Sequence, residues 1–95
     1  MKAKKNQNGF DLRRNHFMEQ KIKQDICIGE NIRDLRKSKN IRQVDLVRLL
    51  QLEGVEMTRE SLVKIERGIQ HVKASQLRGI RDALQVSYDD LLAER

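Results

Sequence analysis

Residues 58–68, with the sequence TRESLVKIERG, carry the signals for one short amphipathic helix and for both of its ends. Thr58 is a good N-cap, and an acidic residue follows in the first turn, where the helix dipole is positive. Leu62 and Ile65 fall on one face, and Gly68 suits the left-handed conformation that commonly ends a helix. The other face is polar and charged. The segment is therefore either a solvated surface helix or a surface that contacts a partner.

Apolar residues at helical spacing predict two helices before this segment. The first begins near residue 28 and stops at Asn40. The second begins at Arg42 or Gln43 and breaks at the glutamate–glycine pair 53–54. Its apolar face is expected to hold five residues: Val44, Leu46, Val47, Leu49 and Leu50.

Two further helices are predicted after residues 58–68. The fourth has an apolar stripe made of Leu77, Ile80 and Leu84. Gly79 lies inside that helix, where glycine costs about 1 kcal/mol relative to alanine, so a close contact with a neighbouring helix is expected there. Ser87 and Asp90 form a capping box that opens a short fifth helix. Three of its residues are expected in the core, with part of that surface available to a dimer contact: Tyr88, Leu91 and Leu92.

Length and composition point to one small all-helical domain. A chain of 95 residues has room for a single modest core. Aromatic residues make up 3% of it and proline is absent, which favours helices over a β-sandwich or barrel. The predicted fold class is all-α, a compact five-helix bundle in residues 26–95. A flexible basic N-terminal arm is predicted for residues 1–25.

The net charge of +6 suggests a polyanionic partner, and most of it lies in the arm. Residues 1–24 hold seven Lys and Arg against two acidic residues, a net of +5, which leaves +1 for the remainder. Such an arm either adds non-specific phosphate affinity or is only a tail. Met18 is an alternative start, which leaves open whether residues 1–17 are native.

Several classes of function lack their sequence signals. Cys27 is the single cysteine, so an intramolecular disulfide is impossible and a buried apolar position is expected. His16 and His71 have no partners at ligand spacing, so neither a metal nor a cofactor is expected. No membrane-spanning or signal segment is apparent, which predicts a cytoplasmic protein. Without a phosphate loop or a nucleophile–base pair, an enzyme is not expected. The scarcity of aromatics argues against RNA recognition by base stacking.

Three segments, in this order, resemble the phage-repressor-like (Cro/Xre-type) helix-turn-helix domains of bacteria and phages. They are IRDLRKSKNIRQVDLVRLL at 32–50, TRESLVKIERG at 58–68 and LRGIRDALQVSYDDLL at 77–92. The similarity spans residues 28–92. It depends on Arg36 near the end of the first helix, on Gln43 at the start of the second, and on the sequence IERG that closes the third.

The resemblance implies that the second helix crosses the phosphate backbone while the third enters the major groove of DNA, N-terminal end first. The residues that match its groove-facing positions are Thr58, Arg59, Glu60, Ser61 and Lys64. Arg59 is suited to bond guanine O6 and N7 together, and Glu60 to accept from cytosine N4 or to orient Arg59. Lys64 reaches either a base or a phosphate.

The resemblance also assigns residues that hold the complex or the fold together. Gln43 matches a position where an amide holds a phosphate, aided by the positive end of its helix. Further candidates for phosphate contacts are Arg42, Arg67 and Lys73. Contacts of this kind fix the position of a protein along the duplex but do not select the base sequence. Arg36 and Glu66 match a buried or half-buried ion pair that ties the first helix to the third.

One departure from the family concerns the spacing of its helices. Gln43 and Thr58 are 15 residues apart, more than the family usually has, so the angle of the third helix in a groove stays open. The sequence is interpreted as a sequence-specific DNA-binding transcriptional regulator, a repressor acting as a homodimer on a two-fold site. The alternative is a protein-interaction module, such as an antitoxin or regulatory partner whose DNA contact is secondary or lost.

Overall fold

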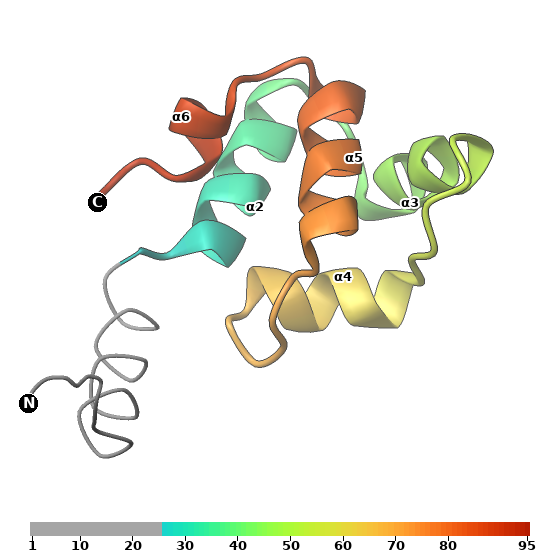
Figure 1. The fold of residues 1–95 in the computed structure, drawn as a ribbon, viewed down its shortest axis with the longest axis horizontal. Coiled ribbons are helices and arrows are strands. Elements are labelled where there is room, and N and C mark those ends of the chain that lie inside the picture. Colours follow the sequence, from blue (N-terminus) through green and yellow to red (C-terminus); the bar gives the residue numbers. More distant parts are fainter. Residues whose placement is uncertain (1–25) are drawn as a thin grey trace, which may run out of the picture.

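The computed structural model describes residues 26–95, which fold into five helices and contain no strand. The helices are α2 (Ile28–Ser38), α3 (Gln43–Leu52), α4 (Arg59–Glu66), α5 (Ala74–Leu84) and α6 (Tyr88–Leu91). Helix α4 packs against both α2 and α3, α5 packs against α3, and α6 packs against α2 (Figure 1). The predicted all-α architecture of five helices is confirmed for this part of the chain. The predicted basic arm in residues 1–25 lies outside the described residues.

The first four of these helices end in the same backbone motif. A residue with a positive φ lies two positions past the end of α2, α3 and α4 and one position past the end of α5: 60° at Asn40, 79° at Gly54, 78° at Gly68 and 56° at Gln85. The next residue then donates its N–H to a carbonyl one turn back, as Ile69 does to Lys64 at 2.9 Å. This hydrogen bond defines a Schellman motif, which satisfies carbonyls that a helix end leaves unpaired. The predicted stops at Asn40, 53–54 and Gly68 are confirmed.

Side-chain caps begin the helices where the sequence predicts them. The N–H of Ser61 donates to Thr58 Oγ1 at 3.1 Å, so Thr58 is the N-cap of α4. At α6, the Asp90 N–H donates to Ser87 Oγ at 3.0 Å and the Ser87 N–H donates to Asp90 Oδ2 at 3.1 Å. Both predicted caps are therefore confirmed.

The core draws on every helix and on the α3–α4 connection. Its buried apolar side chains are Ile32, Leu46, Val47, Leu50, Met57, Leu62, Ile65, Ile80, Leu84 and Leu91. The buried face of α3 is narrower than predicted. Residues 46, 47 and 50 form one buried arc, and the side chains of Val44 and Leu49, which flank this arc, are 41% and 38% exposed. Helix α6 has a single turn and buries only Leu91, so the prediction of a buried Tyr88 and Leu92 is wrong; each is 38% exposed.

Two glycines allow neighbouring helices to approach closely. A Cβ added at Gly79 of α5 would lie 2.9 Å from Leu50 Cδ2, which confirms the predicted close contact. A Cβ added at Gly29 of α2 would lie 1.9 Å from the carbonyl oxygen of Ile65. The backbones of α2 and α4 therefore meet at Gly29, a contact that the sequence analysis did not identify.

The long connection between α3 and α4 is tied down at several points. Gln51 Nε2 donates to the Met57 carbonyl at 3.0 Å, and Gln76 Nε2 of α5 donates to the Glu56 carbonyl at 3.0 Å. The Met57 side chain is buried in the core at 2% exposure. The extra residues thus form a loop that is anchored to α3, to α5 and to the core.

Candidate nucleic-acid interface

A buried polar network joins α2, α3 and α4 at the carboxylate of Glu66. Arg36 donates to it twice, from Nε at 2.8 Å and from Nη2 at 3.0 Å, and Gln43 Nε2 donates at 3.1 Å. Arg36 Nη1 also donates to the Ile41 carbonyl in the α2–α3 turn at 2.9 Å. The two charged side chains are only 7% and 2% exposed. The predicted ion pair is confirmed, and it is bidentate.

This network also orients the start of α3. Gln43 is the first residue of that helix and is half-buried. One N–H of its amide donates to Glu66, which leaves the second N–H of this amide without a partner among the hydrogen bonds of the described residues. A phosphate contact by Gln43 stays a prediction, now with a side chain whose position is set from within the protein.

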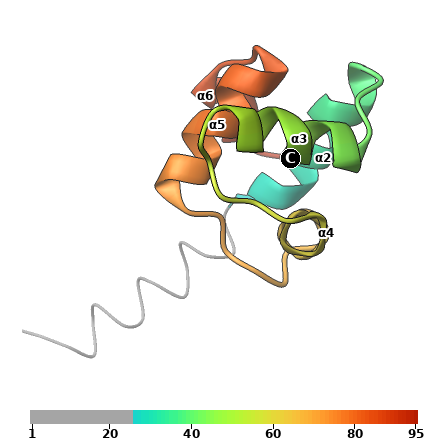
Figure 2. The same cartoon turned by 90° about the vertical axis from the view of Figure 1, so that its right-hand side faces the viewer.

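The outer face of α4 presents the predicted base-reading residues to solvent. Thr58, Arg59, Glu60 and Lys64 are exposed, and Ser61 is half-buried. Figure 2 views α4 end-on, with α3 running across above it, so the two helices cross at a steep angle. Leu62, Ile65 and Glu66 are the buried residues of α4, whereas Arg59 and Glu60 in its first turn are exposed.

Ion pairing distinguishes the cations of this face from some of the others in the described residues, although Arg48 and Arg78 are likewise exposed and make no ion pair there. Arg81 pairs with Asp82 at 2.8 Å, and Arg95 pairs with Glu30 and Asp34 at 3.2 Å and 2.7 Å. By contrast, four exposed cations on α4 and the segments that flank it form no ion pair within residues 26–95: Arg59, Lys64, Arg67 and Lys73. Their charges are available to an external anion.

Arg42 differs from these four because it has an internal partner. Its Nε and Nη2 donate to Asp45 at 2.9 Å and 3.1 Å. The hydrogen bonds lower the pKa of Asp45 and raise the pKa of Arg42. A phosphate would therefore compete with Asp45 for this guanidinium. The i, i+3 spacing of the pair was visible in the sequence but was not used there.

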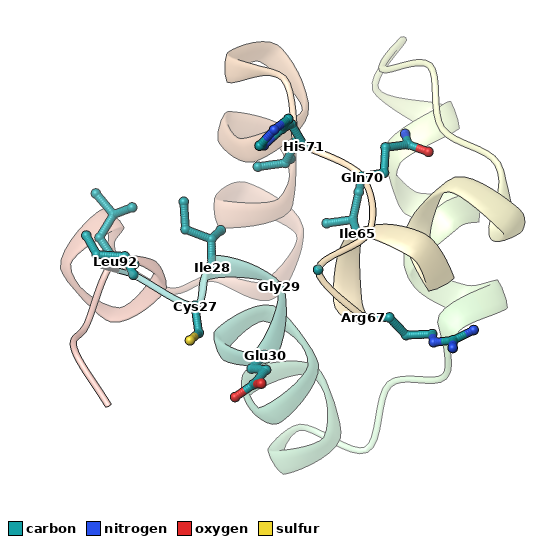
Figure 3. Close-up of a pocket in the computed structure, with 12 residues that line it drawn as sticks. Cys27, Ile28, Gly29, Glu30, Ile65, Arg67, Gln70, His71 and Leu92 are labelled. Atoms are coloured by element: carbon teal, nitrogen blue, oxygen red, sulfur yellow. The ribbon is translucent and has the colours of Figure 1, made fainter. Parts of the chain in front are cut away.

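An open groove of about 660 Å³ lies beside the C-terminal end of α4, between the start of α2 and the 68–72 loop. Apolar side chains of Ile28, Ile65 and Leu92 line it, while Arg67 extends away from them (Figure 3). Cys27 lies at its edge and is exposed, so the predicted burial of this thiol is wrong. Cys27 is the N-cap of α2, outside the apolar stripe of that helix.

The described residues provide no other obvious chemical site. Within residues 26–95 no group of three or more His, Cys, Asp or Glu side chains is placed to hold a metal ion. No helix in the same range is long and apolar enough to cross a membrane. Comparison of the chain with known protein families, curated proteins and solved structures found no significant match.

Proposed function

We propose that residues 26–95 are a helix-turn-helix domain of the phage-repressor-like type that binds double-stranded DNA sequence-specifically and represses transcription. The observation that carries this proposal is the exposed first turn of α4, in which Arg59 and Glu60 are both accessible to solvent. Glu66 at the opposite end of α4 is fixed to α2 and α3. Such a helix is held rigidly and has its polar end free, as a groove-reading element requires.

The dimensions and chemistry of α4 fit a major groove. A helix is roughly 10–12 Å across with its side chains, and the major groove is about 12 Å wide. The guanidinium of Arg59 is chemically suited to bond guanine, and the carboxylate of Glu60 to accept from cytosine or to hold Arg59. Lys64, Arg67 and Lys73 supply positive charge for bases or phosphates on either side. A homodimer would engage two half-sites about 34–36 Å apart.

Alanine substitutions at the two kinds of contact test the proposal. Sites are first selected from a random DNA pool, and affinities are then measured by fluorescence anisotropy over a range of salt concentrations. Arg59→Ala should relax base preference at one position by about 1–3 kcal/mol. Gln43→Ala should weaken all duplexes alike, because a phosphate contact carries no sequence information.

Arg78→Ala is the matched control. Arg78 is an exposed arginine of α5 that makes no ion pair within the described residues, and it is not among the predicted DNA contacts. Its removal should leave base preference unchanged. If Arg59→Ala and Arg78→Ala have the same negligible effect, α4 is not the reading element.

A protein-interaction module is the second candidate, and exposed apolar side chains favour it. Leu52, at the end of α3, is 77% exposed, and Ile69, after α4, is 62% exposed. Under this alternative these residues would contact another protein, as in an antitoxin or regulatory partner. A stoichiometric complex that is insensitive to DNA would support it. Steep salt dependence of duplex binding supports the first proposal instead.

A further inference from the structure

The outer face of α4 contains one apolar residue among charged ones. Val63 lies four residues after Arg59, three after Glu60 and four before Arg67, so all three are its neighbours on the helix surface. It is half-buried. A valine in this position needs a physical reason, because the surrounding side chains are those predicted to reach DNA.

Core packing does not supply that reason. The partly buried apolar residues that pack against the core are Ile28, Leu35, Ile41, Val55, Val72, Leu77, Ala83 and Val86, and Val63 is not one of them. The buried side of α4 is occupied by Leu62, Ile65 and Glu66. Val63 is therefore half-buried without belonging to the core or to the apolar side chains packed against it.

The major groove offers one apolar group on its base edges, the C5-methyl group of thymine or of 5-methylcytosine. When an arginine bonds guanine O6 and N7, this methyl on the pyrimidine at the 5′ side of that guanine lies beside the guanidinium. A short apolar side chain one helical turn from the arginine is then placed to cover the methyl group.

We infer that Val63 is a specificity-determining residue that contacts the C5-methyl group of the pyrimidine 5′ to the guanine read by Arg59. This inference rests on the proposed DNA-binding function. It predicts a half-site containing a methylated pyrimidine followed by guanine. Thymine and 5-methylcytosine provide the same group, so the chemistry recognised is the methyl and not the base that bears it.

Four duplexes that differ only at this base pair test the inference. They carry thymine, deoxyuracil, cytosine or 5-methylcytosine 5′ to the guanine in the selected site. Wild type should bind the methylated member of each pair about fourfold more tightly, the equivalent of roughly 0.8 kcal/mol for burying one methyl-sized group. The thymine–uracil and 5-methylcytosine–cytosine pairs show separately which base serves as the natural source.

Val63→Ala should abolish the preference for the methyl group while keeping the preference for guanine. Val44→Ala is the matched control, since Val44 is also a surface valine, 41% exposed, but lies on α3; it should keep both preferences. Unfolding curves of each variant verify the fold. Equal binding of thymine and deoxyuracil by wild type, or a methyl preference that survives Val63→Ala, overturns the inference while guanine reading by Arg59 stands. Absence of salt-dependent duplex binding overturns the proposed function itself.

Discussion

Glu66 is the residue on which the arrangement of α2, α3 and α4 depends. Its two carboxylate oxygens accept three hydrogen bonds, two from Arg36 and one from Gln43, and the side chain is almost inaccessible to water. A buried pair of this kind has lost its hydration, so its attraction roughly offsets the cost of desolvation. Its role is to fix geometry more than to add stability.

Removing one partner should therefore be far more damaging than removing both. Glu66→Leu should lower the free energy of unfolding by about 3–5 kcal/mol, because the Arg36 charge would remain buried without a counter-charge. The double variant Arg36→Met with Glu66→Leu should recover most of that loss. Urea denaturation of the single and double variants measures the difference.

The double-variant cycle also has a clear negative result. If the losses in the free energy of unfolding caused by Glu66→Leu and by Arg36→Met simply add in the double variant, the two side chains are not coupled and the network does not set the geometry. Recovered stability combined with impaired DNA binding would show instead that Glu66 positions Gln43 and α4 for the proposed function.

At the scale of whole helices, the contact between α2 and α4 depends on the missing side chain at Gly29. The carbonyl of Ile65 lies where a Cβ would be, only 1.9 Å away. Backbone atoms on both sides cannot move without displacing their helices. At Gly79 the obstructing atoms belong instead to the side chains of Leu50 and Val55, at 2.9 Å and 3.0 Å, which have some freedom to adjust.

Alanine substitutions at the two glycines should consequently differ in effect. Gly29→Ala should destabilise the protein by about 1–3 kcal/mol, the usual cost of overpacking, because α2 must shift away from α4. Gly79→Ala should change stability by less than about 1 kcal/mol, since the gain in helix propensity offsets the tighter contact. Thermal unfolding of both variants gives the comparison. A larger loss at Gly79 would show that α3 and α5 are the less tolerant pair.

Across the molecule as a whole, the last residues return to the first described helix. The buried amide of Asn31 donates to the carbonyls of Leu91 and Ala93, both at 2.9 Å. Arg95 donates to Asn31 Oδ1 at 3.0 Å and pairs with Asp34 at 2.7 Å. These bonds hold the C-terminal residues against α2. The ion pair between Arg95 and Asp34 also makes part of the stability of the protein dependent on pH.

The hydrogen bond from Arg95 lowers the pKa of Asp34 below its ordinary value of 3.8. A carboxylate with a depressed pKa contributes stability above its unfolded pKa and loses it as the pH falls through the folded pKa. Asp34→Asn should therefore be less stable than wild type at pH 6, and the two should converge as the pH drops well below 4. Urea denaturation at several pH values measures this.

Glu53→Gln is the control for this pH experiment, because Glu53 is exposed and makes no ion pair within the described residues. Its stability should follow that of wild type at every pH. A gap between wild type and Asp34→Asn that stays constant down to pH 2 would show that the pair with Arg95 does not contribute.

Local features of the fold were determined by the sequence itself. The stops at Asn40 and Gly68, the cap at Thr58 and the capping box at Ser87 all depend on residues within one turn of each other. The Arg36–Glu66 pair was also predicted, through a family resemblance. Periodicity failed at the edges of α3, as for Val44 and Leu49, because apolarity alone does not say how wide a face its neighbours will cover.

Only the tertiary structure decided how the helices meet. The contact at Gly29, the hydrogen bond from Gln43 to Glu66 and the anchoring of Glu56 by Gln76 join residues more than 15 positions apart. Such contacts depend on the relative placement of backbones, which no pattern of residue types along one helix specifies. The sequence therefore determined where helices begin and end, and three-dimensional packing determined which face of α4 is left free.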